Sequence, residues 1–210
     1  MSRSILKGLK EAGVKRLALT PHFYPAKNSI SHFLRSRAEA FEVLLALPEA
    51  KEFSFLLGAE VYLTETLFNS SDLSALCYEG TDRILVEPAE RDGFTAALRD
   101  RLERIVSSYS LTPVIAHIDR FPYLFRSRKN LAELREMGCL FQMNASSLFS
   151  FGTSFTCRRL LKGGWVDFLG NDLHRPIPNP AKFSAQLEKL HRFAGEETAR
   201  IEQNSLSLFG

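Results

Sequence analysis

Short apolar runs alternate with longer amphipathic stretches along most of the chain. Apolar runs that end at a proline, glycine, histidine or acid predict strands at 16–20, 53–57, 83–86, 113–116, 139–143 and 165–169. Apolar residues at helical spacing predict helices at 2–13, 28–47, 94–109, 129–137, 157–162, 181–193 and 196–203, with a short one at 65–69. Strands alternating with helices predict an α/β fold with a mainly parallel sheet, either open or closed into a barrel.

Two of the predicted helices show the amphipathic pattern most clearly. In 94–109 the apolar residues recur every three or four positions, at Phe94, Leu98, Leu102, Ile105, Val106 and Tyr109. In 28–47 much of the apolar face is assigned to Phe33, Ala40, Phe41, Leu44 and Leu45. Because this spacing gathers the apolar side chains on one side, each helix is expected to bury one face.

Composition indicates one globular domain spanning residues 1–210. The chain is 45% hydrophobic and 24% charged, and its net charge of +3 is too small to predict nucleic-acid binding. Its apolar runs are too short to span a membrane, and the charges of Lys7, Lys10 and Glu11 argue against a signal peptide. The three cysteines form no metal-type pair, so we expect reduced structural thiols and a cytoplasmic protein.

The segment 170–174 carries the first candidate chemistry. It follows the predicted strand 165–169, and its Asp172 and His174 stand two positions apart. In extended or tightly turning backbone, residues i and i+2 point the same way, so this carboxylate and imidazole are expected to converge. Such a pair suits a hard-to-borderline divalent metal. The alternative is a loop in which Asp172 caps the next helix and His174 is solvated.

Residues of the same kind follow four other predicted strands. His22 follows 16–20, Glu60 follows 53–57, Glu87 follows 83–86 and His117 follows 113–116. Because chemistry gathers at the C-terminal ends of parallel strands, these side chains are expected to meet Asp172 and His174 at one rim. Each has a structural alternative by itself, as a cap, an ion-pair partner or a buried imidazole, but their joint occurrence favours a shared site.

Divalent metal ions are the cofactor that this residue set predicts. Three imidazoles and three carboxylates at one rim would bury or crowd charge unless cations lie among them. Carboxylates that bridge ions suggest more than one metal, and the mixed nitrogen and oxygen ligands favour Mn, Fe or Zn over Ca or Mg. Metal sites of this composition commonly activate water and neutralise charge on a phosphoryl oxygen.

Two arginines beside these candidates add a way to bind phosphate. Arg120 lies three residues after His117, and Arg175 is adjacent to His174. The planar guanidinium fork matches phosphate oxygens, so both are candidate substrate-binding residues and Arg120 is the candidate catalytic one. The alternative for each is solvation at the surface.

Five motifs in this order resemble the polymerase and histidinol phosphatase (PHP) superfamily. They are Thr20-Pro21-His22-Phe23, Gly58-Ala59-Glu60-Val61, Leu85-Val86-Glu87-Pro88, Pro113 to His117 continuing to Arg120, and Asp172-Leu173-His174. Within it, the chain is most similar to the bacterial protein-tyrosine phosphatases of capsule and exopolysaccharide synthesis, the CpsB/CapC/YwqE group. The Ala-His-x-x-Arg and Asp-x-His segments make this similarity specific, and it runs over nearly the whole chain.

The resemblance implies a distorted seven-stranded, TIM-like (β/α) barrel with a cluster of divalent metals. It implies hydrolysis of phosphotyrosine on the tail of a bacterial tyrosine autokinase that controls polysaccharide assembly. The family's metal ligands carry over onto His22, Glu60, Glu87, His117, Asp172 and His174, and its phosphate-binding arginine carries over onto Arg120.

The sequence departs from the family in two places. The family's opening strand with His-x-His and the acidic turn after it have no counterpart, so we expect a truncated barrel with an open sheet edge that invites homo-oligomers. Of three expected metal sites, only the one formed by Glu60, Glu87 and His117 keeps all its protein ligands, which predicts an incomplete cluster. The family's second arginine falls on Asn179, which leaves Arg175 as a candidate substitute.

Three other functions are alternatives to a metal-dependent tyrosine phosphatase. Cys77 and Arg83 have the C-x5-R spacing of Cys-dependent phosphatases, but Glu79 and Asp82 in the loop would repel phosphate, and Arg83 opens a strand rather than a helix. A small-molecule phosphoesterase of the histidinol-phosphatase type stays open. A degenerate scaffold that binds a phosphoprotein without hydrolysing it also stays open.

Overall fold

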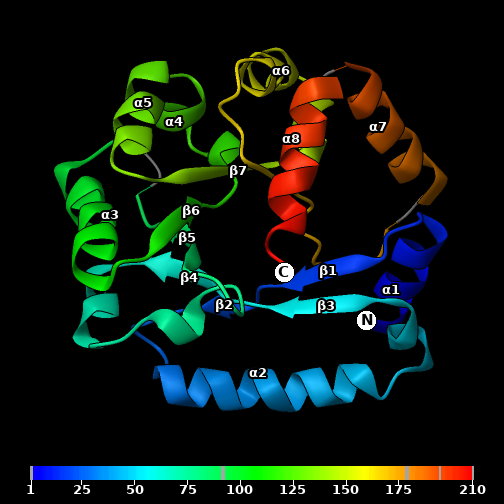
Figure 1. Cartoon of the computed structure of the whole chain (residues 1–210), viewed down its shortest axis with the longest axis horizontal. Helices are drawn as coiled ribbons and strands as arrows, with labels where there is room; N and C mark the ends of the chain where they lie inside the picture. The colour runs from blue at the N-terminus through cyan, green and yellow to red at the C-terminus, as the bar shows by residue number, and fades with distance from the viewer. Residues whose placement is uncertain (1, 91–92, 178–179, 194, 210) are drawn as a thin grey trace.

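Parallel strands alternate with helices in the computed structural model, which describes residues 2–90, 93–177, 180–193 and 195–209 (Figure 1). The strands are β1 (Arg16–Leu19), β2 (His22–Phe23), β3 (Ser54–Leu57), β4 (Glu60–Leu63), β5 (Arg83–Pro88), β6 (Thr112–Ile115), β7 (Leu140–Asn144) and β8 (Phe168–Gly170). The helices are α1 (Ser2–Glu11), α2 (Ile30–Leu45), α3 (Ala96–Tyr109), α4 (Pro122–Phe125), α5 (Arg128–Glu136), α6 (Ser154–Lys162), α7 (Pro180–Phe193) and α8 (Gly195–Leu206). The alternation confirms the predicted α/β class.

Two of the predicted strands are interrupted and then resume in the same direction. β1 pairs with β3 and β2 pairs with β4, both in parallel, and the backbone bonds from Gly58 N to Leu19 O and from Glu60 N to Pro21 O bridge the gap. Pro21 has no N–H to donate to a ladder, which explains a break at this point. With each interrupted strand counted once, the described residues contain the predicted six.

The sheet runs in the order β2, β4, β5, β6, β7, β8 within the described residues. All its pairs are parallel. It curls from β2 through β7, and α8 with the C-terminus lies between β7 and β1 in Figure 1. Within the described residues, β8 and β1 are not paired with each other. The predicted open edge is therefore present among the described strands, and the oligomers expected from it stay a prediction.

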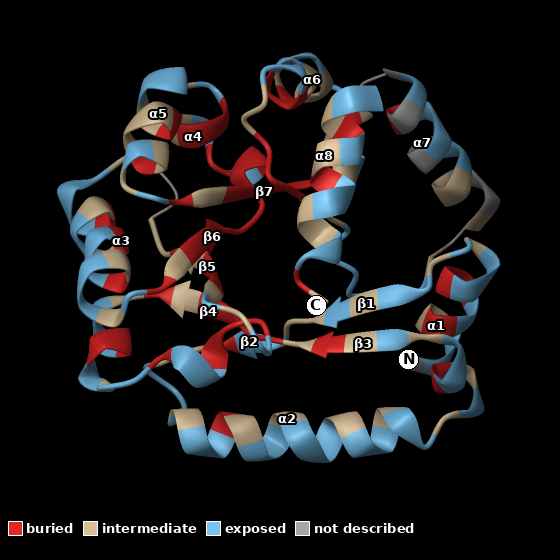
Figure 2. Cartoon of the chain, in the orientation of Figure 1, coloured by how far each residue is buried: buried red, intermediate tan, exposed pale blue. Residues whose placement is uncertain are grey.

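Two apolar clusters hold the layers together. The larger one lies between the sheet and the surrounding helices and includes Leu98, Leu102 and Ile105 of α3, as the helical spacing predicted. The smaller one lines the other face of the sheet, where strand residues pack around Leu208 near the C-terminus. Its buried members are Leu56, Tyr78, Leu85, Val114, Ala116, Phe168 and Leu208. Figure 2 shows buried residues concentrated on β4–β7. Because Leu208 packs within the smaller cluster, the segment that carries it fills the curl of the sheet.

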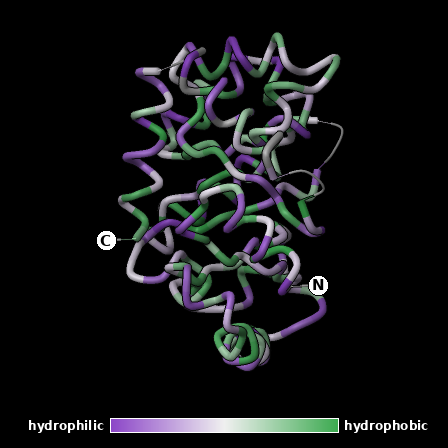
Figure 3. The backbone as a smooth tube through the Cα atoms, turned by 90° about the vertical axis from the view of Figure 1, so that its right-hand side faces the viewer, coloured by the Kyte–Doolittle hydropathy of each residue, from purple (hydrophilic) through white to green (hydrophobic). Residues whose placement is uncertain are grey.

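Helix α2 lies at the edge of the molecule and is less buried than its sequence predicted. Of the apolar face assigned to it, Phe33 is buried, whereas Ala40 and Leu45 are exposed. Figure 3, which views this helix end-on at the lower edge, shows hydrophobic and hydrophilic residues mixed around it. The helix starts at Ile30 rather than at residue 28 because the Ser29 side chain accepts the bond from His32 N and caps it.

The last strand was also predicted too early. β8 covers 168–170 rather than 165–169, because Trp165 N still bonds to Leu160 O and completes the turn that ends α6. The first two predicted strands also extend further than expected, because after each interruption they resume as β2 at His22 and as β4 at Glu60. No helix in the described part of the chain is both long and apolar enough to cross a membrane.

Candidate metal centre

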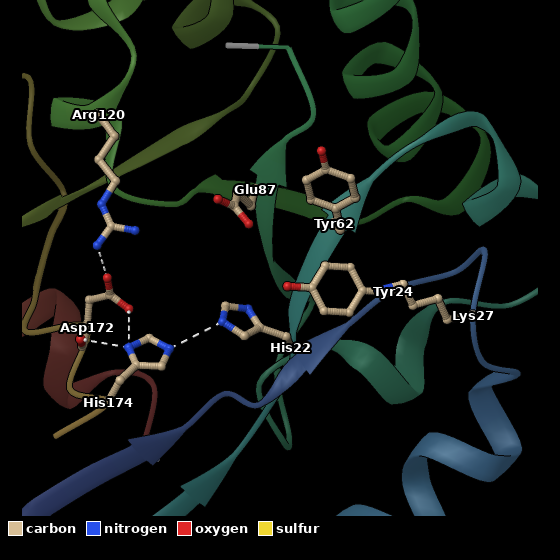
Figure 4. A pocket seen from close by; sticks show the side chains of 8 residues that line it. All are labelled: His22, Tyr24, Lys27, Tyr62, Glu87, Arg120, Asp172 and His174. Carbon is tan, nitrogen blue, oxygen red and sulfur yellow. Dashed lines mark hydrogen bonds and ion pairs between the residues drawn. The ribbon is translucent and has the colours of Figure 1, made fainter.

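The six predicted metal ligands lie together, in and just behind a pocket of about 520 Å³. The pocket is lined by His22, Tyr24, Lys27, Tyr62, Glu87, Arg120, Asp172 and His174 (Figure 4). Glu60 and His117 are buried beneath it and contact its lining residues. The structure therefore brings residues from five strands to one place, as expected from their positions near strand ends.

A series of contacts links the exposed side of this group to its buried side. His174 Nδ1 lies 3.2 Å from Asp172 Oδ1, and His174 Nε2 lies 3.2 Å from His22 Nε2. The two imidazoles stack with 5.4 Å between ring centroids and 20° between planes. His22 Nδ1 then lies 3.5 Å from Glu60 Oε1. His22 thus borders both the carboxylate cluster and the Asp-x-His segment.

Glu60 lies at the centre of the group. Its Oε1 is 3.9 Å from His117 Nε2, which is itself 3.3 Å from Glu87 Oε1. One ligand atom from each of His22, Glu60 and Glu87 lies within 4.8 Å of the others. Glu60 is 7% exposed, yet its Oε1 has no hydrogen-bond donor among the described residues. A buried carboxylate oxygen without a donor, beside imidazoles and a second carboxylate, fits a divalent cation.

The two carboxylates of this cluster differ in their electrostatic environment. Burial raises the pKa of Glu60, and the imidazoles of His117 and His22 oppose that rise only in part. The pKa of Glu87 is lowered, chiefly because its carboxylate accepts a hydrogen bond from His117. The ionised form of Glu60 is therefore unfavourable without a cation beside it, whereas the ionised form of Glu87 is stabilised by its surroundings.

The backbone at two of the candidate ligands takes an uncommon conformation. His117 and Asp172 have φ values of 31° and 46°, in the left-handed region that residues with a side chain seldom adopt. His117 N donates to the Gln142 side chain, and the buried Asp119 carboxylate accepts bonds from Asn144 N at 2.8 Å and from Ser147 Oγ at 2.7 Å. Strain held by such bonds is typical of functional sites.

Gly170 leaves the space that the Gln142 amide occupies, and this gives a first prediction. A Cβ at Gly170 would overlap the Gln142 side-chain nitrogen, so Gly170→Ala must displace the group that fixes His117. We expect the free energy of unfolding to fall by about 1–3 kcal/mol and metal affinity to fall with it, as measured by urea unfolding and calorimetry. Gly93→Ala, where nothing lies within 4 Å of the added Cβ, is the matched control. Wild-type stability in Gly170→Ala would contradict this account.

The two predicted phosphate-binding arginines have different positions. Arg120 lines the pocket, and its guanidinium pairs with the Asp172 carboxylate. Its side chain is 50% exposed, so the fork is accessible to a ligand. Arg175 is exposed and is not among the lining residues, so its role stays a prediction. Asn179, the other position considered, lies outside the described residues.

Three lining residues were not predicted from the sequence. Tyr24 and Tyr62 each lie two positions after a candidate ligand, His22 and Glu60, and Lys27 follows in the next turn. Because alternate residues of a strand share a face, the two-residue spacing was the signal that places both tyrosines in the pocket. This signal depends on strands β2 and β4, which the apolar runs of the sequence do not predict.

Known proteins resemble the chain along most of its length. A family model described as "Capsular polysaccharide synthesis, CpsB/CapC" matches residues 1–205. "Tyrosine-protein phosphatase CpsB" of Streptococcus pneumoniae is 23% identical over 213 residues, which cover 95% of this chain and 85% of that protein. The protein of the same name from Streptococcus agalactiae is 23% identical over 158 residues, covering 71% of this chain and 64% of the relative.

Solved structures support the fold. The chain matches a structure described as belonging to YwqE from Bacillus subtilis and CpsB from Streptococcus pneumoniae, "unique metal-dependent tyrosine phosphatases", with a TM-score of 0.70. The match has 20% sequence identity and covers 96% of this chain and 85% of the other. This likeness confirms the predicted fold, and together with the family match it identifies the group: the chain belongs to the CpsB/CapC family of capsular polysaccharide synthesis proteins.

Proposed function

We propose that the chain is a metal-dependent phosphatase that hydrolyses phosphotyrosine. The observation that carries the proposal is the buried Glu60 oxygen without a donor, which lies among imidazoles and carboxylates and next to a pocket that contains the Arg120 guanidinium. Membership of the CpsB/CapC family, whose curated relatives are named tyrosine-protein phosphatases, supports the same activity.

The residues of the pocket divide into those suited to metals and those suited to phosphate. His22, Glu60, Glu87 and His117, together with the Asp-x-His segment, would hold divalent ions, with Mn first and Fe or Zn as alternatives. When bound, such ions supply Lewis-acid chemistry and activate water at neutral pH. Arg120 lines the pocket, and in this proposal its planar fork binds the phosphoryl oxygens of the substrate and orients phosphorus.

The substrate that fits this family is the phosphotyrosine tail of a bacterial tyrosine autokinase in capsule or exopolysaccharide synthesis. We infer a cytoplasmic site of action, because such a tail would be phosphorylated where ATP is available. Co-precipitation of the chain with the phosphorylated tail, but not with the unphosphorylated tail, would support this partner, and equal capture of both would argue against it.

Substrate comparison tests the proposed reaction against its alternatives. With Mn²⁺ present, we expect turnover of a phosphotyrosine peptide to exceed that of histidinol phosphate and of the matching phosphoserine peptide. Preferred turnover of histidinol phosphate would instead assign the chain to the small-molecule phosphoesterases. Tight binding of the phosphotyrosine peptide without any turnover would favour the phosphoprotein-binding scaffold.

A thiol mechanism makes a different prediction. Cys77 is buried, and burial together with Asp82 and Asp72 raises its pKa to about 12, so a thiolate is not available at neutral pH. Cys77→Ser is therefore expected to keep phosphotyrosine-peptide turnover within about twofold of wild type, because a buried thiol that does not ionise takes no part in the reaction. The rate of phosphate release measures this, and an inactive, folded Cys77→Ser protein would revive the cysteine mechanism.

A further inference from the structure

Two tyrosines form an aromatic wall on one side of the pocket. The rings of Tyr24 and Tyr62 lie with 5.6 Å between centroids and 54° between planes. Tyr62 belongs to β4 and is in register with Glu87 of β5, while Tyr24 directly follows β2. The ring pair is therefore built onto the same two strands that carry His22 and Glu60, which fixes its place relative to the candidate metal ligands.

The Tyr24 ring is held from two further directions. The His22 ring lies 5.7 Å away between centroids, and Lys27 Nζ lies 4.9 Å from the ring centroid. By contrast, neither tyrosine hydroxyl hydrogen-bonds to another residue in the described part of the chain. Both side chains are half-buried. Their rings are thus positioned by packing, and their polar ends are not needed to hold the fold together.

The pocket has distinct sides. Figure 4 shows Arg120, Asp172 and His174 on one side, Tyr24 and Tyr62 on the opposite side, and Glu87 and His22 between them. The Arg120 guanidinium, which suits a phosphoryl dianion, therefore faces a wall of ring surface across Glu87 and His22. A volume of about 520 Å³ has room for a phosphoryl group together with one aromatic ring.

We propose that Tyr24 and Tyr62 are specificity-determining residues, which pack against the ring of an aryl phosphate ester and favour it over alkyl phosphates. The inference rests on the proposed phosphatase function and adds the residues that recognise the aryl group of its substrate. Offset or edge-to-face contacts between aromatic rings contribute to binding beyond the apolar area that they cover. Each wall residue is expected to strengthen aryl binding by roughly five- to tenfold.

Equilibrium binding of two non-hydrolysable phosphonates tests the wall without relying on catalysis. Phenylphosphonate carries the ring and methylphosphonate lacks it, so the ratio of their dissociation constants for the Mn²⁺-loaded chain isolates the ring's contribution. Calorimetry is expected to show tighter binding of phenylphosphonate to wild type. In Tyr24→Ala and Tyr62→Ala this preference should fall by roughly five- to tenfold each, with methylphosphonate affinity retained.

Conservative variants separate a role of the ring from a role in folding. The phenylalanine variants Tyr62→Phe and Tyr24→Phe keep the ring and should retain the preference for phenylphosphonate. The leucine variants Tyr62→Leu and Tyr24→Leu keep much of the packing volume but should lose part of that preference. Thermal unfolding of each variant identifies any alanine variant that does not fold. In that case the leucine variants show whether the ring contributes to the binding of phenylphosphonate.

Each remaining outcome has one meaning for the wall. An unchanged preference for phenylphosphonate in folded alanine or leucine variants would overturn the proposed role of the two tyrosines. An equal loss of affinity for both phosphonates would overturn it too. Because binding is measured directly, a chain that prefers phenylphosphonate through these residues but turns over no phosphate ester would leave the wall standing and refute the phosphatase function instead.

Discussion

Replacing Glu60 with glutamine is expected to abolish tight Mn²⁺ binding and to lower phosphotyrosine-peptide turnover by at least about 100-fold. Changes to residues that merely support metal ligands already cost up to about 100-fold, and Glu60 contacts both His22 and His117 at the centre of the group. The metal-free protein should not be destabilised, because burial raises the pKa of Glu60 and the amide removes a charge that is costly without a cation.

The Glu60 prediction needs metal binding and stability to be measured on the same samples. Titration calorimetry with Mn²⁺ gives the affinity, and urea unfolding in chelator gives the stability of the metal-free chain. Glu65→Gln is the matched control, because Glu65 is exposed and pairs only at the surface with Arg104 at 3.0 Å. A Glu60→Gln protein that binds Mn²⁺ like wild type would remove Glu60 from the site.

The second large effect is expected at Arg120. Arg120→Ala should lower phosphotyrosine-peptide turnover by about 100-fold, the usual consequence of removing one donor to a developing phosphoryl charge. Mn²⁺ binding should persist, because Arg120 carries no metal-binding atom and only pairs with Asp172. Arg120→Lys should recover only part of the loss, since an ammonium group cannot make the two parallel bonds of a guanidinium.

Kinetic constants distinguish a phosphate-binding role for Arg120 from a structural one. The values of kcat and KM for a phosphotyrosine peptide, with inhibition by inorganic phosphate, are compared among wild type, Arg120→Ala and Arg120→Lys. Arg128→Ala, a change at an exposed arginine on α5, is expected to behave as wild type. Unchanged phosphate inhibition in a folded Arg120→Ala protein would mean that this side chain does not contact the phosphoryl group.

Sequence periodicity predicted the sheet and the meeting of the six side chains because both depend on local pattern. Each parallel strand delivers its C-terminal end to the same edge, so knowing that Glu87 and His117 follow strands was enough to place them together. The apolar runs 16–20 and 53–57 likewise predict strand ends at Pro21 and Gly58. They are interruptions instead, and His22 and Glu60 open new strands in register with one another.

What the sequence did not reveal depends on contacts between distant segments. Gly170 lies against the Gln142 amide, and that amide bonds to His117 N. These residues come from three separate segments, so the contacts leave no local pattern in the sequence. The packing of Leu208 inside the curl of the sheet likewise depends on where the chain returns. The aromatic wall differs, because its two-residue spacing from His22 and Glu60 is local but has meaning only once β2 and β4 are known to begin at those ligands.

Metal content and activity measured on one sample test the central claim most directly. Elemental analysis of the purified chain is combined with a phosphotyrosine-peptide assay before chelation, after chelation and after Mn²⁺ is restored. The account predicts bound Mn, Fe or Zn, with the incomplete cluster expected from the sequence giving fewer than three ions per chain. It also predicts that activity disappears with the metal and returns with Mn²⁺. Full turnover in a metal-free sample would contradict it.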